Sequence, residues 1–265
     1  MPAGSLTVVG TGIAFGVQLT PQARMAIERA DDVFYLLAEP AAEVWFRKLS
    51  PSAHSLRPHY AVGRERAETY VRMVEEILGA VREGRNVCAV FYGHPGVFAS
   101  PSHEAVRRAR AEGFSAVMLP AVSAEDCLFA DLGVDPGESG CQSYEATDFL
   151  LRRRTFDPAA PLVLWQVAFI GVTGAPVEPS PHAFGVLVDH LLEFYEDSHR
   201  VIVYEASPYP VGAASIREFT LGEVRAAELG AMSTLYVPPA AVTPVDAGLR
   251  ARLDAANVEP VPERL

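Results

Sequence analysis

Lysine is almost missing from this 265-residue chain, in which Lys48 is the only one. Lysine and arginine together number 22 against 33 aspartates and glutamates, which gives a formal net charge of −11. Nucleic-acid-binding proteins usually present a basic surface, and an excess of acidic residues opposes such a surface. The same excess opposes attraction to an anionic membrane. The composition therefore disfavours nucleic acid and membrane as partners.

Cysteines and long apolar runs are also scarce. Cys88, Cys127 and Cys141 show no CxxC spacing, and a small odd number of cysteines is typical of a reducing compartment. Residues 1–6 lack the basic and apolar segments of a signal peptide. The longest uncharged stretch, residues 158–177, contains prolines and glycines that do not suit a membrane helix. We therefore expect a cytoplasmic protein.

Two further classes of chemistry lack their signals. His94 and His103 have no second ligand at helical or turn spacing, so we expect no metal site. The G-x-S-x-G turn of serine hydrolases is missing from the sequence.

Strand and helix patterns alternate along the first half of the chain. This alternation predicts a mainly parallel sheet with helices on its faces. Thr20 and Pro21 form a helix-start signal, and an apolar stripe runs along residues 65–82. Strands are expected at residues 5–9, 33–37, 86–91 and 115–119, and helices at residues 21–30, 65–82 and 102–112 and after Pro40.

The regular alternation of strand and helix patterns changes after Pro120, where we place a domain boundary. The fold class is α/β, with an N-terminal α/β domain over residues 1–119 and a C-terminal α/β domain over residues 120–239. Residues 240–265 form a tail or a dimer clasp. Strands are expected at residues 141–144, 162–166, 200–204 and 233–237, and helices at residues 123–132, 146–153, 183–195 and 221–229.

Glycine-containing turns follow two of the expected strands. Gly10 and Gly12 follow the first strand, but Gly16 comes too late for the G-x-G-x-x-G dinucleotide spacing, which favours a tight turn. Residues 91–98 join a hydrophobic strand to a loop with two glycines and a proline. Such a loop lets backbone amides approach a ligand at the carboxyl end of a parallel sheet. We therefore interpret residues 92–98 as a ligand loop.

Two pairs of residues have both a functional and a structural interpretation. Ser123 and Asp126 have capping-box spacing, and the helix start there either holds a carboxylate or is a capped structural helix. Arg66 and Tyr70 share a helix face, with Tyr60 just before the helix. A guanidinium beside a phenol lowers the pKa of the phenol. Alternatively, Tyr70 belongs to the core and Arg66 passes over it.

These segments together resemble the tetrapyrrole methylase family of S-adenosylmethionine-dependent methyltransferases. Residues 6–12 are similar to its first strand and glycine turn, and residues 92–96 to its central cofactor loop. Residues 120–124 resemble its P-G-V-S segment, with Ala121 in place of the glycine. Residues 233–235 stand where the family has a late strand near the adenine.

Within that family the chain most resembles the borosin peptide backbone α-N-methyltransferases, over roughly residues 5–239. Tyr60, Arg66, Tyr70 and Tyr92 fall on positions of active-site tyrosines and arginine in this group, and Arg57 stands where some members have another tyrosine. The segments that carry the likeness are residues 91–98, 122–132, 144–150, 164–167 and 184–189.

The resemblance implies a class III methyltransferase fold, with S-adenosylmethionine held between two domains and S-adenosylhomocysteine as product. It also implies an interlocked homodimer that methylates successive backbone amides of a ribosomally made peptide. No metal is implied. The implied cofactor-binding residues are Gly10, Gly12, Tyr92, Gly93, His94, Pro95, Gly96, Val97, Phe98, Ser123, Ala124, Tyr144, Gln166, Ser233 and Thr234.

The implied mechanism needs a base for the amide proton and a donor for the developing oxyanion. We assign Tyr70 as the base beside Arg66 and Tyr60 as the donor, although the two tyrosines could exchange roles. Tyr92 would line the methyl donor. Residues 240–265 contain no apolar segment that resembles a methylated core, so we expect a split enzyme with a separate precursor peptide. The alternatives are methylation of a tetrapyrrole or small metabolite, and a catalytically silent subunit that binds cofactor and peptide.

Overall fold

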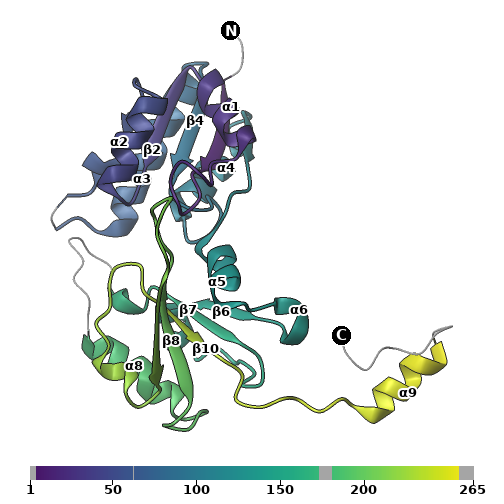
Figure 1. Ribbon diagram of the computed structural model, residues 1–265. Helices are drawn as coiled ribbons and strands as arrows, with labels where there is room; N and C mark the ends of the chain where they lie inside the picture. The colour runs from purple at the N-terminus through teal and green to yellow at the C-terminus, as the bar shows by residue number, and fades with distance from the viewer. Residues whose placement is uncertain (1–3, 62, 173–180, 257–265) are drawn as a thin grey trace. The chain divides into compact units, whose positions relative to one another are not determined.

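A computed structural model describes residues 4–61, 63–172 and 181–256 (Figure 1). Contacts between its residues divide the chain into two compact units. Unit 1 consists of Met1–Leu132, Val172–Val177 and Ala206–Ala214. Unit 2 consists of Gly133–Gly171, Glu178–Glu205 and Ser215–Leu265.

The division differs from the predicted boundary near Pro120. Helix α5 (Ala124–Leu132) groups with unit 1, and so does the short segment Ala206–Ala214. The backbone N–H of Phe15 donates to the carbonyl oxygen of Pro208 at 3.1 Å, and the rings of Phe15 and Tyr209 meet edge to face. These contacts explain why a segment from late in the chain belongs to the first unit.

Unit 1 is built on a five-stranded sheet in the order β3-β2-β4-β1-β5, in which every pair of neighbours is parallel. The predicted mainly parallel sheet is confirmed for this unit. Its strands are β1 (Ser5–Gly10), β2 (Asp32–Leu36), β3 (His54–Ser55), β4 (Asn86–Phe91) and β5 (Ser115–Met118), and its other helices are α1 (Pro21–Arg29), α2 (Pro40–Leu49), α3 (Arg66–Arg82) and α4 (Ser100–Ala111).

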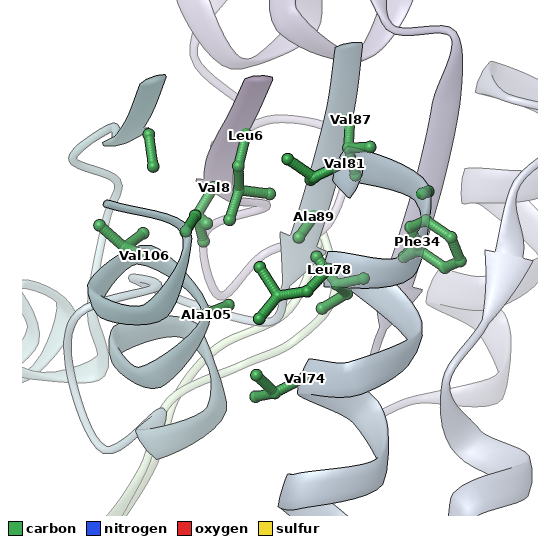
Figure 2. Close-up of a cluster of buried hydrophobic side chains, with 14 of the residues drawn as sticks. Leu6, Val8, Phe34, Val74, Leu78, Val81, Val87, Ala89, Ala105 and Val106 are labelled. Carbon is green, nitrogen blue, oxygen red and sulfur yellow. The ribbon is translucent and has the colours of Figure 1, made fainter. Parts of the chain in front are cut away.

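Separate apolar clusters cover the two faces of this sheet. Leu78 of α3 and Ala105 of α4 pack with Leu6 and Val8 of β1 on one face (Figure 2). Helices α1 and α2 supply Ile27, Phe46 and others to the opposite face. A strand that is buried on both faces is apolar throughout, which explains the continuous run in β4.

Local signals set the starts of two helices in unit 1. The hydroxyl of Thr20 accepts a hydrogen bond from the backbone N–H of Ala23 at 3.1 Å, which confirms the predicted start of α1. Helix α3 begins at Arg66, one residue later than predicted. It buries Met73, Ile77 and the other apolar residues of its predicted stripe, whereas Tyr70 is only half-buried.

Unit 2 is built on a five-stranded sheet in the order β6-β7-β10-β8-β9. Only β6 and β7 pair in parallel, and the other neighbours are antiparallel. The strands are β6 (Gln142–Glu145), β7 (Leu162–Trp165), β8 (Arg200–Glu205), β9 (Ser215–Thr220) and β10 (Thr234–Val237), and the helices are α6 (Pro136–Ser139), α7 (Ala146–Leu151), α8 (Pro181–Leu191) and α9 (Ala247–Ala256).

The helix predicted at residues 221–229 is wrong, because only a 3-10 turn forms there, at Val224–Ala226. The N–H groups of Leu221 and Gly222 donate to the carbonyl oxygens of His199 and Asp197 instead of starting a helix. The preceding strand, β9, was not predicted. None of the helices in the described part of the chain has both the length and the apolar character to span a membrane.

Candidate active site

Three loops of unit 1 meet at the carboxyl edge of its parallel sheet. They follow β1, β4 and β5, and the parallel register places Gly10 opposite Phe91 and Val8 opposite Met118. A Cβ atom added to Gly10 would lie 2.0 Å from the carbonyl oxygen of Gly93 and 2.8 Å from the Cβ of Ala121. Only glycine fits at this crossing, which brings together three of the segments singled out in the sequence.

Gly12 and Gly93 link the first two of these loops. The N–H of each donates to the carbonyl oxygen of the other, at 3.2 and 3.1 Å. Both glycines have positive φ, at 72° and 67°, where a side chain would be strained. The sequence-predicted glycine turn and ligand loop therefore form one backbone cradle.

Gln18 is a further residue of this region that sequence reasoning missed. Its Oε1 accepts hydrogen bonds from the N–H groups of Ile13 and Ala14 at 2.7 and 2.9 Å, and its Nε2 donates to the sulfur of Cys127 at 3.6 Å. Gln18 thus ties the turn after Gly12 to α5. Its place six residues after Gly12 was the only available signal.

The start of α5 has the structure of a capping box. The Ser123 hydroxyl accepts from the N–H of Asp126 at 3.2 Å, and the Asp126 carboxylate accepts from the Ser123 N–H at 2.7 Å. Asp126 therefore already supplies a carboxylate at this helix start. The arrangement favours the structural interpretation of Ser123 over the binding of a second carboxylate there.

Tyr60, Arg66 and Tyr70 lie on the chain that leads from β3 to β4. Tyr60 follows the 3-10 turn Arg57–His59, and Arg66 and Tyr70 occupy the first two turns of α3. Because α3 runs back toward the start of β4, its beginning lies on the carboxyl-edge side of the sheet. The three side chains therefore share that side with the glycine cradle.

The side chains of Tyr60 and Tyr70 lie close enough to influence each other. Desolvation and the nearby Tyr70 hydroxyl raise the pKa of Tyr60 well above its usual range, while the charges of Arg66 and Arg57 oppose the shift. Tyr60 is 39% exposed, so solvent reaches the pair. The structure thus brings the two predicted tyrosines and the predicted arginine into one group, in which Tyr60 retains its proton.

Polar contacts to α2, to α3 and to the residue after β2 hold the segment that carries Tyr60. Arg57 donates to the carbonyl oxygen of Leu37 at 2.8 Å and to Glu43 of α2 at 2.5 Å. His59 pairs with Glu76 of α3. Because these contacts flank Tyr60 directly, they fix its approach to α3. Arg57 therefore has an anchoring role, although the borosin resemblance suggested an aromatic residue there.

Tyr92 lies in different surroundings from the Tyr60 group. Its N–H donates to the carbonyl oxygen of Leu36 at 3.1 Å, which extends the pairing of β4 with β2. Burial and the neighbouring Cys127 and Glu39 raise the pKa of Tyr92 above its usual range. Tyr92 is therefore a neutral phenol near neutral pH, which suits lining a site and not removing a proton.

The predicted cofactor residues of unit 2 gather at one end of its sheet. Tyr144 of β6 and Leu235 of β10 both stand opposite Leu164 of β7. The ends of β6 and β7 therefore lie beside the start of β10, where Ser233 and Thr234 are found. Gln166, just after β7, takes a left-handed backbone conformation with φ of 58°.

Two of these side chains already serve the fold of unit 2. The buried Ser233 hydroxyl donates to the Glu205 carboxylate at 2.5 Å and accepts from the N–H of Gly230 at 2.9 Å. The Tyr144 ring packs against Phe149, and its hydroxyl donates to the carbonyl oxygen of Thr155 at 3.5 Å. Their contribution to a cofactor site remains a prediction.

The cradle of unit 1 lies at the carboxyl edge of a parallel sheet. Gly10, Gly12 and Gly93 are buried, and a Cβ atom on Gly10 or Gly12 would meet other parts of unit 1, so these glycines let the loops after β1 and β4 pack closely at this edge. Open α/β sheets bind their ligands at this edge. Among the described residues, no group of three or more histidines, cysteines and acids could hold a metal ion.

A first unit with a glycine cradle at the edge of a parallel sheet, followed by a second α/β unit, is an arrangement typical of α/β proteins that bind ligands at the sheet edge. The model of the tetrapyrrole (corrin/porphyrin) methylases matches residues 5–224 of the chain. The chain belongs to this family and carries its methyltransferase domain.

Curated relatives share more than 40% of the residues. A methyltransferase/ribosomally synthesized type I borosin cyclic peptide precursor from Coprinopsis marcescibilis is 44% identical over 246 residues, covering 90% of this chain and 63% of the relative. A gymnopeptides precursor of the same kind from Gymnopus fusipes is 41% identical over 267 residues, covering 99% of this chain and 64% of the relative. The chain thus spans less than two thirds of these relatives.

The fold also matches solved structures. The uroporphyrin-III-C-methyltransferase of Thermus thermophilus superposes with a TM-score of 0.63 at 19% identity, covering 93% of this chain and 99% of that chain. At this identity the likeness shows the fold alone. It confirms the predicted tetrapyrrole methylase-like α/β fold.

Proposed function

We propose that this protein transfers the methyl group of S-adenosylmethionine to backbone amide nitrogens of a ribosomally made peptide. The observation that carries the proposal is the grouping of Tyr60 with Tyr70 and Arg66, both of which act on the Tyr60 hydroxyl. The names of the relatives, which combine a methyltransferase with a ribosomally synthesized peptide precursor, support the peptide substrate. We infer a homodimer from the family resemblance alone.

An amide nitrogen is a weak nucleophile, because its lone pair is delocalised into the carbonyl. The bound cofactor supplies an activated methyl group. The chain must therefore remove the amide proton and stabilise the charge that develops on the carbonyl oxygen. We propose that Tyr70 accepts the proton, with Arg66 nearby to stabilise a phenolate.

Tyr60 suits the second task. Its raised pKa keeps the hydroxyl protonated, so it is a donor for the developing oxyanion. This reasoning favours Tyr60 as the donor and Tyr70 as the base over the reverse assignment. Tyr92, also neutral, would orient the amide toward the methyl group.

The test compares Tyr70→Phe and Arg66→Ala with the wild-type chain. Both variants should bind S-adenosylhomocysteine normally and lose at least about 100-fold in methylation rate, as expected when acid–base catalysis is removed. Arg72→Ala is the matched control, because Arg72 lies on the same helix but is exposed and pairs with Glu68. Wild-type rates in both test variants would contradict the assignment.

The peptide arrives on a separate chain in our proposal. The relatives named above carry the methyltransferase and the precursor in one protein. The assay therefore offers a candidate peptide both free and fused after Leu265, with mass spectrometry counting the methyl groups. Methylation of the fused peptide alone would contradict supply in trans.

Methylation of a tetrapyrrole is the second candidate, and the family model that matches residues 5–224 favours it. Corrin and porphyrin precursors are therefore included in the same assay. Methyl transfer to a ring and not to a peptide would replace the proposed substrate. Cofactor and peptide binding without any methyl transfer would instead indicate a silent subunit.

A further inference from the structure

The imidazole of His94 folds back onto the loop that carries it. Its Nδ1 accepts a hydrogen bond from the N–H of Gly96 at 2.9 Å. A side chain that accepts from the N–H two residues later is the arrangement of an Asx turn, which asparagine and aspartate usually form. Here a histidine closes the turn.

The contact leaves no space at Gly96. A Cβ atom there would lie 3.1 Å from Cε1 of His94 and 3.1 Å from the sulfur of Met118. Gly96 is therefore packed between the His94 ring and Met118. This packing fixes the ring as well as the peptide.

The carbonyl side of Gly96 is held by a second histidine. His103, in the first turn of α4, has its Nε2 at 2.9 Å from the carbonyl oxygen of Gly96. The neighbouring Ser102 hydroxyl lies within hydrogen-bonding distance of the carbonyl oxygen of Pro95. Both backbone polar groups of Gly96 thus bind imidazole nitrogens.

The two rings have opposite hydrogen-bonding roles. An N–H group must meet an unprotonated nitrogen, so Nδ1 of His94 is the accepting nitrogen and carries no proton in this bond. A carbonyl oxygen must meet a donor, so His103 carries a proton on Nε2. Exchanging the roles would break both bonds.

The loop needs such restraint because Phe98, two residues beyond Gly96, has a φ of 50°. A bulky residue in the left-handed region stores strain that surrounding contacts must offset. The bonds at Gly96 act together with those of its neighbours, the Val97 N–H to the carbonyl oxygen of His94 at 3.1 Å and the Ser102 N–H to the carbonyl oxygen of Ala99 at 3.1 Å.

We propose that His94 and His103 clamp the Gly96 peptide and thereby position residues 92–98 to bind the cofactor. His94 is then a positioning residue and not a direct cofactor contact, which changes the role suggested by the family resemblance. The inference rests on the proposed function, in which this loop holds S-adenosylmethionine.

The clamp predicts that a different amide side chain keeps the hydrogen bond at each position: asparagine at position 94 and glutamine at position 103. In His94→Asn, the side-chain oxygen takes the place of Nδ1 and still accepts from Gly96, whereas His94→Gln and His94→Leu lose the bond. In His103→Gln, the amide nitrogen takes the place of Nε2 and still donates, whereas His103→Asn is too short. Each position thus supplies its own matched control.

The first readout is S-adenosylhomocysteine affinity by calorimetry, with thermal unfolding to confirm folding. His94→Leu and His94→Gln should bind about tenfold more weakly, the effect of one lost hydrogen bond in a restrained loop, and His94→Asn within about twofold of the wild type. His103→Asn should weaken binding by only about two- to threefold, because His103 is exposed.

The second readout is the amide exchange rate of Gly96 without cofactor, measured by NMR. Exchange should accelerate in His94→Leu and His94→Gln and stay slow in His94→Asn. Long-range nitrogen spectra of the wild type should show an unprotonated Nδ1 on His94.

Two outcomes would overturn the clamp. If His94→Gln retains affinity and His94→Asn loses it, the distal nitrogen contacts the cofactor directly. If all variants bind equally well, the loop needs no clamp. Absence of S-adenosylhomocysteine binding by the wild type would contradict both proposals, whereas the expected pattern without peptide methylation would contradict only the peptide substrate.

Discussion

The five-stranded sheets of the two units differ in the direction of their strands. Every neighbouring pair in unit 1 is parallel, whereas only β6 and β7 are parallel in unit 2. Parallel strands all end at one edge, so their direction alone brings the loops after β1, β4 and β5 together there. In unit 2, the predicted site residues come together only because the ends of β6 and β7 lie beside the start of β10. Sheet direction therefore decides where each unit can collect site residues.

The two sheets also differ in burial. Strand β4 is covered on both faces and reads as a continuous apolar run, which is why its limits were predicted at residues 86–91. Strand β9 lies at an edge, and none of its residues is fully buried. Its sequence, SIREFT, carries no apolar run. The exposure of β9 thus left no apolar pattern from which this strand could be predicted.

The largest expected effect on stability comes from substitutions in the two separate hydrophobic cores. Leu78 and Leu187 are completely buried, in unit 1 and unit 2 respectively. Replacing either with alanine removes a full core side chain and should cost about 2–5 kcal/mol of unfolding free energy. Because the cores are separate, we expect calorimetry to show each substitution lowering a transition of its own unit. One common transition, lowered equally by both, would show that the units unfold together.

A glycine substitution tests the crossing of the three loops in unit 1. Gly10→Ala forces a Cβ against the carbonyl oxygen of Gly93 and should cost about 1–3 kcal/mol, with loss of S-adenosylhomocysteine binding. Gly79→Ala in α3 and Gly185→Ala in α8 are matched controls, because their added Cβ meets nothing closer than 3.6 Å. Both controls should gain up to about 1 kcal/mol. Normal cofactor binding by Gly10→Ala would contradict the cradle.

Each unit contains a pair of residues whose side chains accept hydrogen bonds from each other's backbone N–H groups. The pair is Ser123 and Asp126 in unit 1, and Thr220 and Glu223 in unit 2. Ser123→Ala removes the cap of α5 and should cost about 1 kcal/mol in urea unfolding. In unit 2, Thr220 makes the corresponding bonds with Glu223, but these start only a short 3-10 turn. Thr220→Ala should therefore have a smaller effect. The bonds lower the pKa of Glu223, so their contribution is present near neutral pH and is lost on acidification.

The smallest effect concerns a buried hydroxyl of unit 2. Tyr195 is 5% exposed, and among the described residues its hydroxyl has no hydrogen-bond partner. Tyr195→Phe should therefore be neutral or stabilise by up to about 1 kcal/mol. Burial raises the pKa of Tyr195 to about 12, so the wild type loses stability from pH 10 to pH 12 as the unfolded chain ionises first. Thermal unfolding of Tyr195→Phe should show a smaller loss. A clear destabilisation at neutral pH would reveal a partner for the hydroxyl.

The candidate site was predictable where its residues are close in sequence. Arg66 and Tyr70 share a helix face at a spacing of four, and Ser123 and Asp126 form the predicted box. Gln18 and the bonding role of His103 were missed, because their partners are set by loop geometry and not by a fixed spacing. Spacing along a helix is a local property, whereas a loop places its side chains only once the sheet beneath it has formed.

The sequence by itself determined the local elements: the start of α1 at Thr20 and Pro21, the buried stripe of α3 and the runs that form the parallel sheet. Hydrogen bonds over three or four residues and apolar periodicity suffice for these. Tertiary structure alone decided the crossing at Gly10, the approach of Tyr60 to Tyr70 and the turn in place of a helix at Val224–Ala226. In each case backbone or side chains distant in sequence compete for the same space or the same polar groups, and only the packed chain settles which contacts form.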